Sequence, residues 1–150
     1  MLPFCHFEIR ATRPRSSQYP KQINTIGEHI RARRLDLNLL QRQVADQIGV
    51  HPLTVTNWES NESSPETQFI PAIIEFLGYD PLPPASSLPE RLASRRKVLG
   101  LSQRKMAERM CVDQSTLRGR EAGLHLPTGK SMDGIERALQ IPARRIKDVR

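Results

Sequence analysis

The sequence predicts an all-α protein made of two copies of one small helical domain behind an irregular N-terminal arm. Three observations support this fold class. The chain contains an internal repeat, and each half has apolar residues at helical spacing between helix-start and helix-stop signals. The composition, 37% hydrophobic with 5% aromatic residues, is typical of small helical domains, and 150 residues are enough for two of them.

The repeat appears when the sequence is shifted by 62 positions. Residues 25–80, the first copy, then lie over residues 87–142, the second copy, and 14 of the 56 pairs are identical. The identical pairs include Arg33/Arg95, Arg34/Arg96, Gln41/Gln103, Arg42/Arg104 and Glu59/Glu121. Between the copies, residues 81–86 form a proline-rich linker, which at about 3 Å per residue spans roughly 20 Å. The two copies are therefore not expected to tumble freely.

Residues 41–59 are predicted to form two short helices joined by a tight turn. Gly49 ends the first helix because glycine adopts a left-handed conformation without steric cost, and Pro52 suits the first position of the second helix. The side chains expected to face inward are Val44, Ala45, Ile48, Val55 and Trp58. Leu53, Thr56 and Asn57 therefore face outward.

This stretch resembles the helix-turn-helix of the phage repressor and Cro type, also called the xenobiotic response element family. The matching residues are Gln41, Ala45, Gly49, Val50, Val55 and Glu59. The resemblance covers both copies and implies a lambda repressor-like fold of four to five helices per copy. It also implies a bacterial type of transcriptional regulator that binds double-stranded DNA sequence-specifically, commonly as a repressor. A homodimer on a two-fold symmetric site and a monomer spanning two half-sites both remain open.

The resemblance carries over a set of candidate DNA contacts. In the first copy these are Gln41, Arg42, His51, Pro52, Leu53, Thr56 and Asn57, and in the second copy they are Gln103, Arg104, Gln114, Ser115 and Arg118. Asn57 or Gln114 could pair with an adenine edge, Leu53 could touch a thymine methyl group, and Arg118 suits guanine. The two glutamines that open the first helix of each pair could instead be ordinary polar residues at a helix start.

The first helix of each copy is expected to begin at a capping box, Thr25 with Glu28 and Ser87 with Glu90. It should turn Ile26, Ile30 and Leu37 inward in the first copy, and Leu88, Leu92 and Leu99 in the second. The basic residues expected to face outward are Arg31, Arg33, Arg34, Arg95, Arg96 and Lys97. They form either a solvated face or a set of phosphate contacts, and we add Arg33, Arg34, Arg95 and Arg96 to the candidate DNA contacts.

The second copy departs from the family pattern at three positions. Cys111 replaces the turn glycine, Gly119 lies inside the second helix, and Arg120 stands where the first copy has Trp58. Glycine inside a helix costs roughly 1 kcal/mol relative to alanine, which weakens the expectation that this copy reads bases. Cys111 is expected to be a small buried residue.

Charge distinguishes the two copies. The first copy carries −4, the second +5, and the arm (residues 1–24) and the tail (residues 143–150) each add +3, giving the net charge of +7. Because non-specific DNA affinity follows positive charge, we expect the first copy to read sequence while the second clamps the backbone. The acidic first copy also favours an alternative, a protein-interaction module such as an antitoxin or a bridging factor.

The remaining features of the sequence limit which functions are expected. Histidines and cysteines show no metal-ligand spacing, and no catalytic constellation stands out, so we expect no metal, no cofactor and no enzymatic activity. With two cysteines, no export signal and no membrane-spanning run, a cytoplasmic protein is expected.

The arm is a floppy terminus or a basic strand on DNA, with a possible short strand at Phe4, Phe7 and Ile9. Fourth helices with Phe69, Ile73, Ile74 and Leu77, and with Met132, Ile135 and Leu139, should close the two cores.

Overall fold

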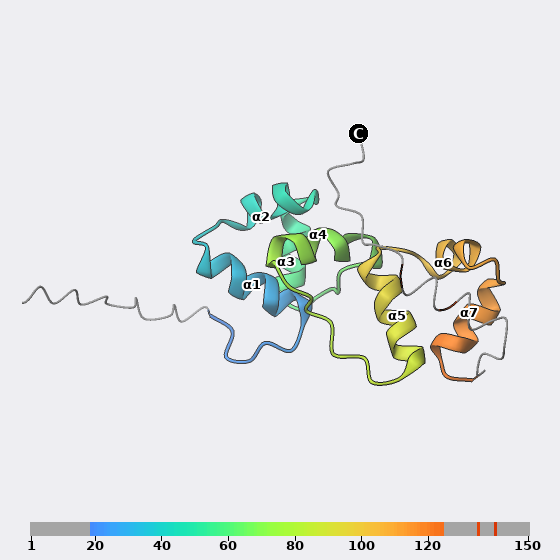
Figure 1. Ribbon diagram of the computed structural model, residues 1–150. Coiled ribbons are helices and arrows are strands. Elements are labelled where there is room, and N and C mark those ends of the chain that lie inside the picture. Colours follow the sequence, from blue (N-terminus) through green and yellow to red (C-terminus); the bar gives the residue numbers. More distant parts are fainter. Residues whose placement is uncertain (1–18, 125–134, 136–139, 141–150) are drawn as a thin grey trace, which may run out of the picture.

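The computed structural model describes residues 19–124 together with residues 135 and 140. The first copy contains α1 (Ile26–Asp36), α2 (Gln41–Ile48), α3 (Pro52–Glu59), the 3₁₀ helix η1 (Thr67–Phe69) and α4 (Ile70–Leu77). The second copy contains α5 (Leu88–Val98), α6 (Gln103–Arg109) and α7 (Gln114–Glu121). Within residues 19–124 every regular element is helical, which confirms the all-α fold class (Figure 1).

The first helix of each copy begins at the predicted capping box. At the start of α1, the Thr25 hydroxyl accepts a hydrogen bond from the Glu28 N–H at 3.1 Å. The Glu28 carboxylate in turn accepts from the N–H groups of Asn24 and Thr25, at 2.8 and 3.0 Å. The N–H of Asn24 contributes most to lowering the pKa of Glu28, because it stabilises the charged carboxylate. Ser87 and Glu90 repeat the box at the start of α5.

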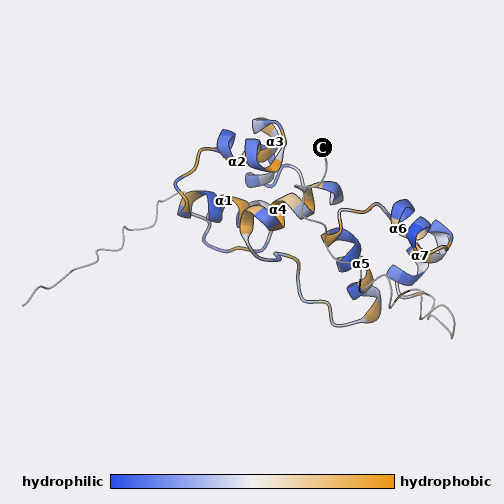
Figure 2. Cartoon of the chain, turned by 45° about the horizontal axis from the view of Figure 1, so that its top comes forward, coloured by the Kyte–Doolittle hydropathy of each residue, from blue (hydrophilic) through white to orange (hydrophobic). Residues whose placement is uncertain are grey.

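Each copy has its own cluster of buried apolar side chains. The first consists of Ile30, Val44, Ala45, Ile48, Val55, Trp58, Ile70, Ile73 and Leu77. The second consists of Leu92, Leu101, Met106, Ala107, Leu117 and Ile135. Trp58 is 3% exposed, so its predicted place in the core is confirmed. In Figure 2, α6 and α7 are mostly hydrophilic, whereas α4, which closes the first core, carries mainly apolar residues.

The repeat extends to the rare backbone conformations. Three pairs of residues that the 62-residue shift aligns all have positive φ angles: Asn38/Gly100 at 55° and 66°, Gly49/Cys111 at 82° and 53°, and Asn61/Gly123 at 61° and 71°. Gly49 ends α2 in this conformation, as predicted. Cys111 occupies the same turn and is exposed. The expectation of a buried cysteine was wrong, because the turn position points to solvent.

The structure also corrects the interior of α1. Ile30 and Leu92 are buried as expected, but Leu37 is 43% exposed. It is the C-cap residue of α1, beyond the last turn that faces the core, and Leu39 packs against the core instead. Within the arm, the Tyr19 hydroxyl donates to Asp36 at 3.4 Å. The expected strand in the arm, the closing residues Met132 and Leu139, and the tail lie outside the described residues.

Candidate nucleic-acid interface

In each copy the second helix of the helix-turn-helix packs across the two helices that precede it. The helix α3 packs against α2 and α1, and α7 packs in the same way against α6 and α5. The turns close with equivalent hydrogen bonds, from the N–H of Val50 to the carbonyl of Ala45 and from Val112 to Ala107, both 3.0 Å. Val55 and Leu117 anchor the inner faces of α3 and α7 and are fully buried. We call α3 and α7 the reading helices. The face of each that is opposite its buried anchor points away from the core.

A buried ion pair fixes the end of the first reading helix. The Arg34 guanidinium donates to both carboxylate oxygens of Glu59, at 2.7 and 2.8 Å, and to the carbonyl of Leu39 at 3.3 Å. The two side chains are only 13% and 4% exposed. Gln41 Nε2 donates to the same carboxylate at 2.9 Å. This network joins α1, α2 and α3, because each of its side chains comes from a different helix.

The second copy contains the same network at the shifted positions. Arg96 donates to Glu121 at 2.6 and 3.1 Å and to the carbonyl of Leu101 at 3.2 Å, and Gln103 Nε2 donates to Glu121 at 2.9 Å. Arg96 is a buried residue. The expectation that Arg34 and Arg96 face outward was therefore wrong. Their guanidinium groups are turned inward because a buried glutamate on the reading helix attracts them.

The two copies differ in how they use the glutamine of this network. In the first copy, Gln41 Oε1 accepts a hydrogen bond from the Thr56 hydroxyl at 3.0 Å, and this hydroxyl also lies 3.2 Å from the carbonyl of Pro52. Both ends of the Gln41 amide are thus engaged inside the protein. In the second copy Arg118 stands at the position of Thr56 and is exposed. The Arg118 guanidinium is therefore available to a ligand.

The outward positions of the reading helices are chemically unlike. On α3, His51 and Leu53 are exposed, whereas Pro52, Thr56 and Asn57 are half-buried. On α7, Gln114, Ser115 and Arg118 are all exposed. His51 has a second role, since its Nδ1 accepts from the N–H of Leu53 at 3.3 Å and caps α3. The outward positions of α3 thus include no Asp, Glu, Lys or Arg, whereas those of α7 are polar and include Arg118.

The other basic candidates fall into two groups. Arg42 and Arg104, which begin α2 and α6, are exposed, and Arg33 and Arg95 are half-buried. Lys105 is also exposed on α6 and was not among the predicted contacts. In the second copy, Arg120 occupies the position of Trp58 and is half-buried. Exposed cations thus lie beside the second reading helix, on the neighbouring α6.

The ion pairs were the main feature that sequence reasoning missed, although a signal existed. Arg34 and Glu59 are 25 residues apart, and both are kept identical in the repeat, as Arg96 and Glu121. Two copies that share few outward residues had retained an arginine and a glutamate together. A shared internal contact explains this retention better than a shared DNA phosphate.

Comparison with known proteins agrees with this geometry. A helix-turn-helix family model of the Cro and phage-repressor type matches residues 30–82 and, a second time, residues 92–146. Since the two matches cover more than half of the chain, the protein belongs to this family of DNA-binding transcription regulators. Searches of curated proteins and of solved structures found no match. Among the described residues, no helix is long and apolar enough to cross a membrane.

Proposed function

We propose that this protein binds double-stranded DNA sequence-specifically through α3 and α7 and regulates transcription, acting as a repressor by occupying promoter DNA. The observation that carries the proposal is the arrangement of each reading helix. A buried ion pair and a buried core fix its inner face, while Leu53 near the start of α3 and Gln114 and Ser115 at the start of α7 remain exposed. We further propose that residues 25–80 and 87–142 are two domains. One chain then brings two reading helices to DNA as a monomer or within a homodimer.

The chemistry of the reading helices supports different tasks for the two copies. Leu53 and Asn57 suit thymine methyl groups and adenine edges, whereas Arg118 suits guanine or a phosphate. The first copy carries −4 and the second +5. The first copy is therefore the main reader of sequence, and the second supplies most of the backbone attraction. Because Arg96 is engaged with Glu121, that attraction comes from exposed side chains such as Arg104 and Lys105.

Selection from randomised duplex DNA at near-physiological salt tests this function. The wild-type protein is expected to enrich a motif. Asn57→Ala is expected to weaken the discrimination between bases at one position of that motif by about 1–3 kcal/mol. Lys105→Ala is expected to leave the motif unchanged and to lower the salt slope by about 0.9. Equal effects of the two substitutions would contradict the division of tasks. Retention of DNA without any motif would contradict sequence-specific binding.

A protein-interaction role is the second candidate, and one observation favours it. Leu40 and Leu53, on the acidic first copy, are 69% and 60% exposed, and serines stand at the aligned positions of the second copy. A contiguous apolar patch that contained both leucines would be typical of a contact with another protein. Tight binding of a partner polypeptide, combined with no salt-dependent retention of DNA, would favour this role over transcriptional regulation.

A further inference from the structure

The two copies contact each other through one specific pair of surfaces. The helix α5, which begins the second copy, packs against α4 and η1 at the end of the first copy. In Figures 1 and 2, α4 and α5 lie side by side in the middle of the molecule, with α2 and α3 on one side and α6 and α7 on the other. The spacing and orientation of the two reading helices therefore depend on the α4–α5 contact.

A glycine permits this contact at its closest point. A Cβ atom added to Gly100, just after α5, would lie 2.9 and 3.2 Å from Cγ and Cδ of Pro71 and 3.4 Å from the carbonyl oxygen of Gln68. Pro71 lies in the first turn of α4, and its ring is closed onto the backbone, so it cannot swing aside. Any side chain at residue 100 would thus push the copies apart.

Comparison of the two copies shows that residue 100 must be glycine because of packing and not because of its backbone conformation. Gly100 has a φ angle of 66°, but its counterpart Asn38 holds a φ of 55° with a side chain that is exposed. Asparagine is among the few residues that tolerate this conformation. The left-handed turn alone therefore does not require glycine at residue 100. The close approach of Pro71 does.

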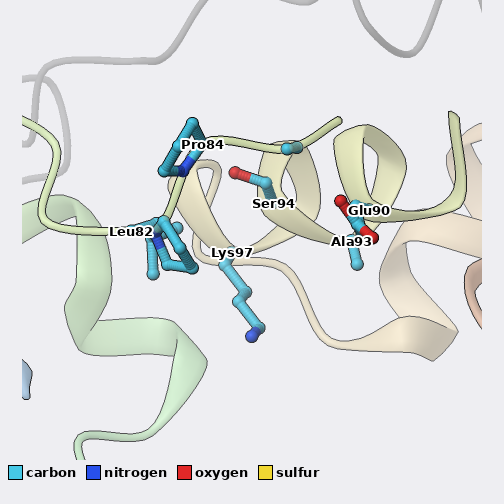
Figure 3. A pocket seen from close by; sticks show the side chains of 8 residues that line it. Leu82, Pro84, Glu90, Ala93, Ser94 and Lys97 are labelled. Carbon is cyan, nitrogen blue, oxygen red and sulfur yellow. The ribbon is translucent and has the colours of Figure 1, made fainter. Parts of the chain in front are cut away.

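The linker runs beside α5. Residues 82–85 lie along the face of α5 that carries Glu90, Ala93, Ser94 and Lys97, and together they line an open pocket of about 330 Å³ (Figure 3). Prolines at positions 83 and 84 limit the conformations of this segment. The short linker thus limits how far the copies can separate, whereas the α4–α5 contact fixes their orientation.

We infer that the contact between Gly100 and Pro71 locks the two copies in one orientation, so that a single chain presents α3 and α7 to DNA at one fixed spacing. This inference rests on the proposed DNA-binding function, but the docking itself can be measured without DNA. Gly100 is then a specificity-determining residue that touches no base. It selects the distance and the rotation between the two parts of the DNA site.

The substitution Gly100→Asn tests the docking. It introduces the residue that the first copy carries at the equivalent position, so the backbone is tolerated and the clash with Pro71 remains. The matched control is Gly123→Asn, which copies Asn61; a Cβ at Gly123 would meet its nearest neighbour, Pro89, at an ordinary 3.7 Å. Backbone ¹⁵N relaxation should give one common rotational correlation time for both copies in the wild-type protein and in Gly123→Asn. In Gly100→Asn, the two copies should have shorter and different correlation times.

The DNA experiment uses the selected site and a version with five additional base pairs between its two parts. Five base pairs are about half a helical turn and move the second part to the opposite face of the duplex. The wild-type protein should bind the unaltered spacing on the order of 100-fold more tightly, and Gly100→Asn should reduce this ratio to below about 10-fold. A wild-type preference that ignores spacing, or equal ratios for the two proteins, would overturn the inference.

A double substitution shows whether the ring of Pro71 is the obstacle. Pro71→Ala removes the two atoms nearest to the added Cβ, so Gly100→Asn combined with Pro71→Ala should recover a common correlation time and part of the spacing preference. No recovery would overturn the assigned contact. If no variant selects a DNA motif, the proposed function fails, and the relaxation data alone then decide whether the copies are docked.

Discussion

Removing the cation from the buried ion pair of the first copy should separate a structural role of Arg34 from a DNA-binding one. In Arg34→Met the unbranched stem of the side chain is kept while the guanidinium is lost. The Glu59 carboxylate, 4% exposed, then loses donors at 2.7 and 2.8 Å, and among the described residues the donor that remains is Gln41 at 2.9 Å. Leaving a buried charge without its partner costs about 3–5 kcal/mol of unfolding free energy. A loss of about 3–5 kcal/mol lowers the folded-to-unfolded ratio by a factor of roughly 10² to 4 × 10³, and it is a large part of the about 5–15 kcal/mol that a small domain has in total.

Urea denaturation followed by tryptophan fluorescence measures this loss. Trp58 is the only tryptophan in the chain and is buried in the first core, so its emission reports on the copy that contains Arg34. The matched control is Arg42→Met, at an exposed arginine of α2, which should change the unfolding free energy by no more than about 0.5 kcal/mol. If Arg42 contacts a phosphate, Arg42→Met should instead lower the salt slope of DNA binding by about 0.9.

The opposite pattern would refute this reasoning. If Arg34→Met costs as little stability as Arg42→Met and lowers the salt slope, Arg34 is a phosphate contact and the buried pair is not important for the fold. A second substitution adds a further check. Replacing both members of a buried pair by apolar residues is often neutral, so Arg34→Met combined with Glu59→Met should recover much of the lost stability.

Three further predictions concern the turn after α7, the capping box of α1 and the hydrogen bond between Thr56 and Gln41. Gly123→Asn should stabilise the second copy by about 0.4–1 kcal/mol in chemical denaturation, since Asn61 holds the equivalent left-handed position; a loss of stability would argue against this equivalence. The pKa of Glu28 is held below its ordinary value of 4.5 by backbone N–H donors, so its stabilising effect is present above pH 4.5 and is lost as the pH falls through the lower folded-state pKa. Denaturation between pH 6 and pH 3 should therefore show a weaker pH dependence in Glu28→Gln. Thr56→Val should cost about 1 kcal/mol, because the amide oxygen of Gln41 loses its donor, and an unchanged denaturation midpoint would contradict this contact.

Local signals in the sequence were enough to predict the helices and their ends. The capping boxes at Thr25 and Ser87, the left-handed stop at Gly49 and the proline that opens α3 each depend on residues within one turn of the chain. The inward positions of Val55 and Trp58 follow from helical spacing in the same way. The repeat then transferred these predictions to the second copy, and the family match agrees with them.

The directions of the arginines could not be predicted in this way. Consecutive residues on a helix are rotated by about 100°, so the sequence places Arg33 and Arg34 on adjacent faces without indicating which one meets α3. That choice depends on Glu59, 25 residues away, and on the angle at which α3 crosses α1. Exposure of Leu37 likewise depends on where α1 leaves the core.

The sequence by itself therefore determined the helices, their caps, the two cores and the family, because each depends on short-range patterns or on the repeat. Only the tertiary structure decided that Arg34 and Arg96 turn inward and that Gly100 packs against Pro71. Both results depend on contacts between segments far apart in the chain. Their geometry is set by how complete helices pack, and no local pattern in the sequence records it.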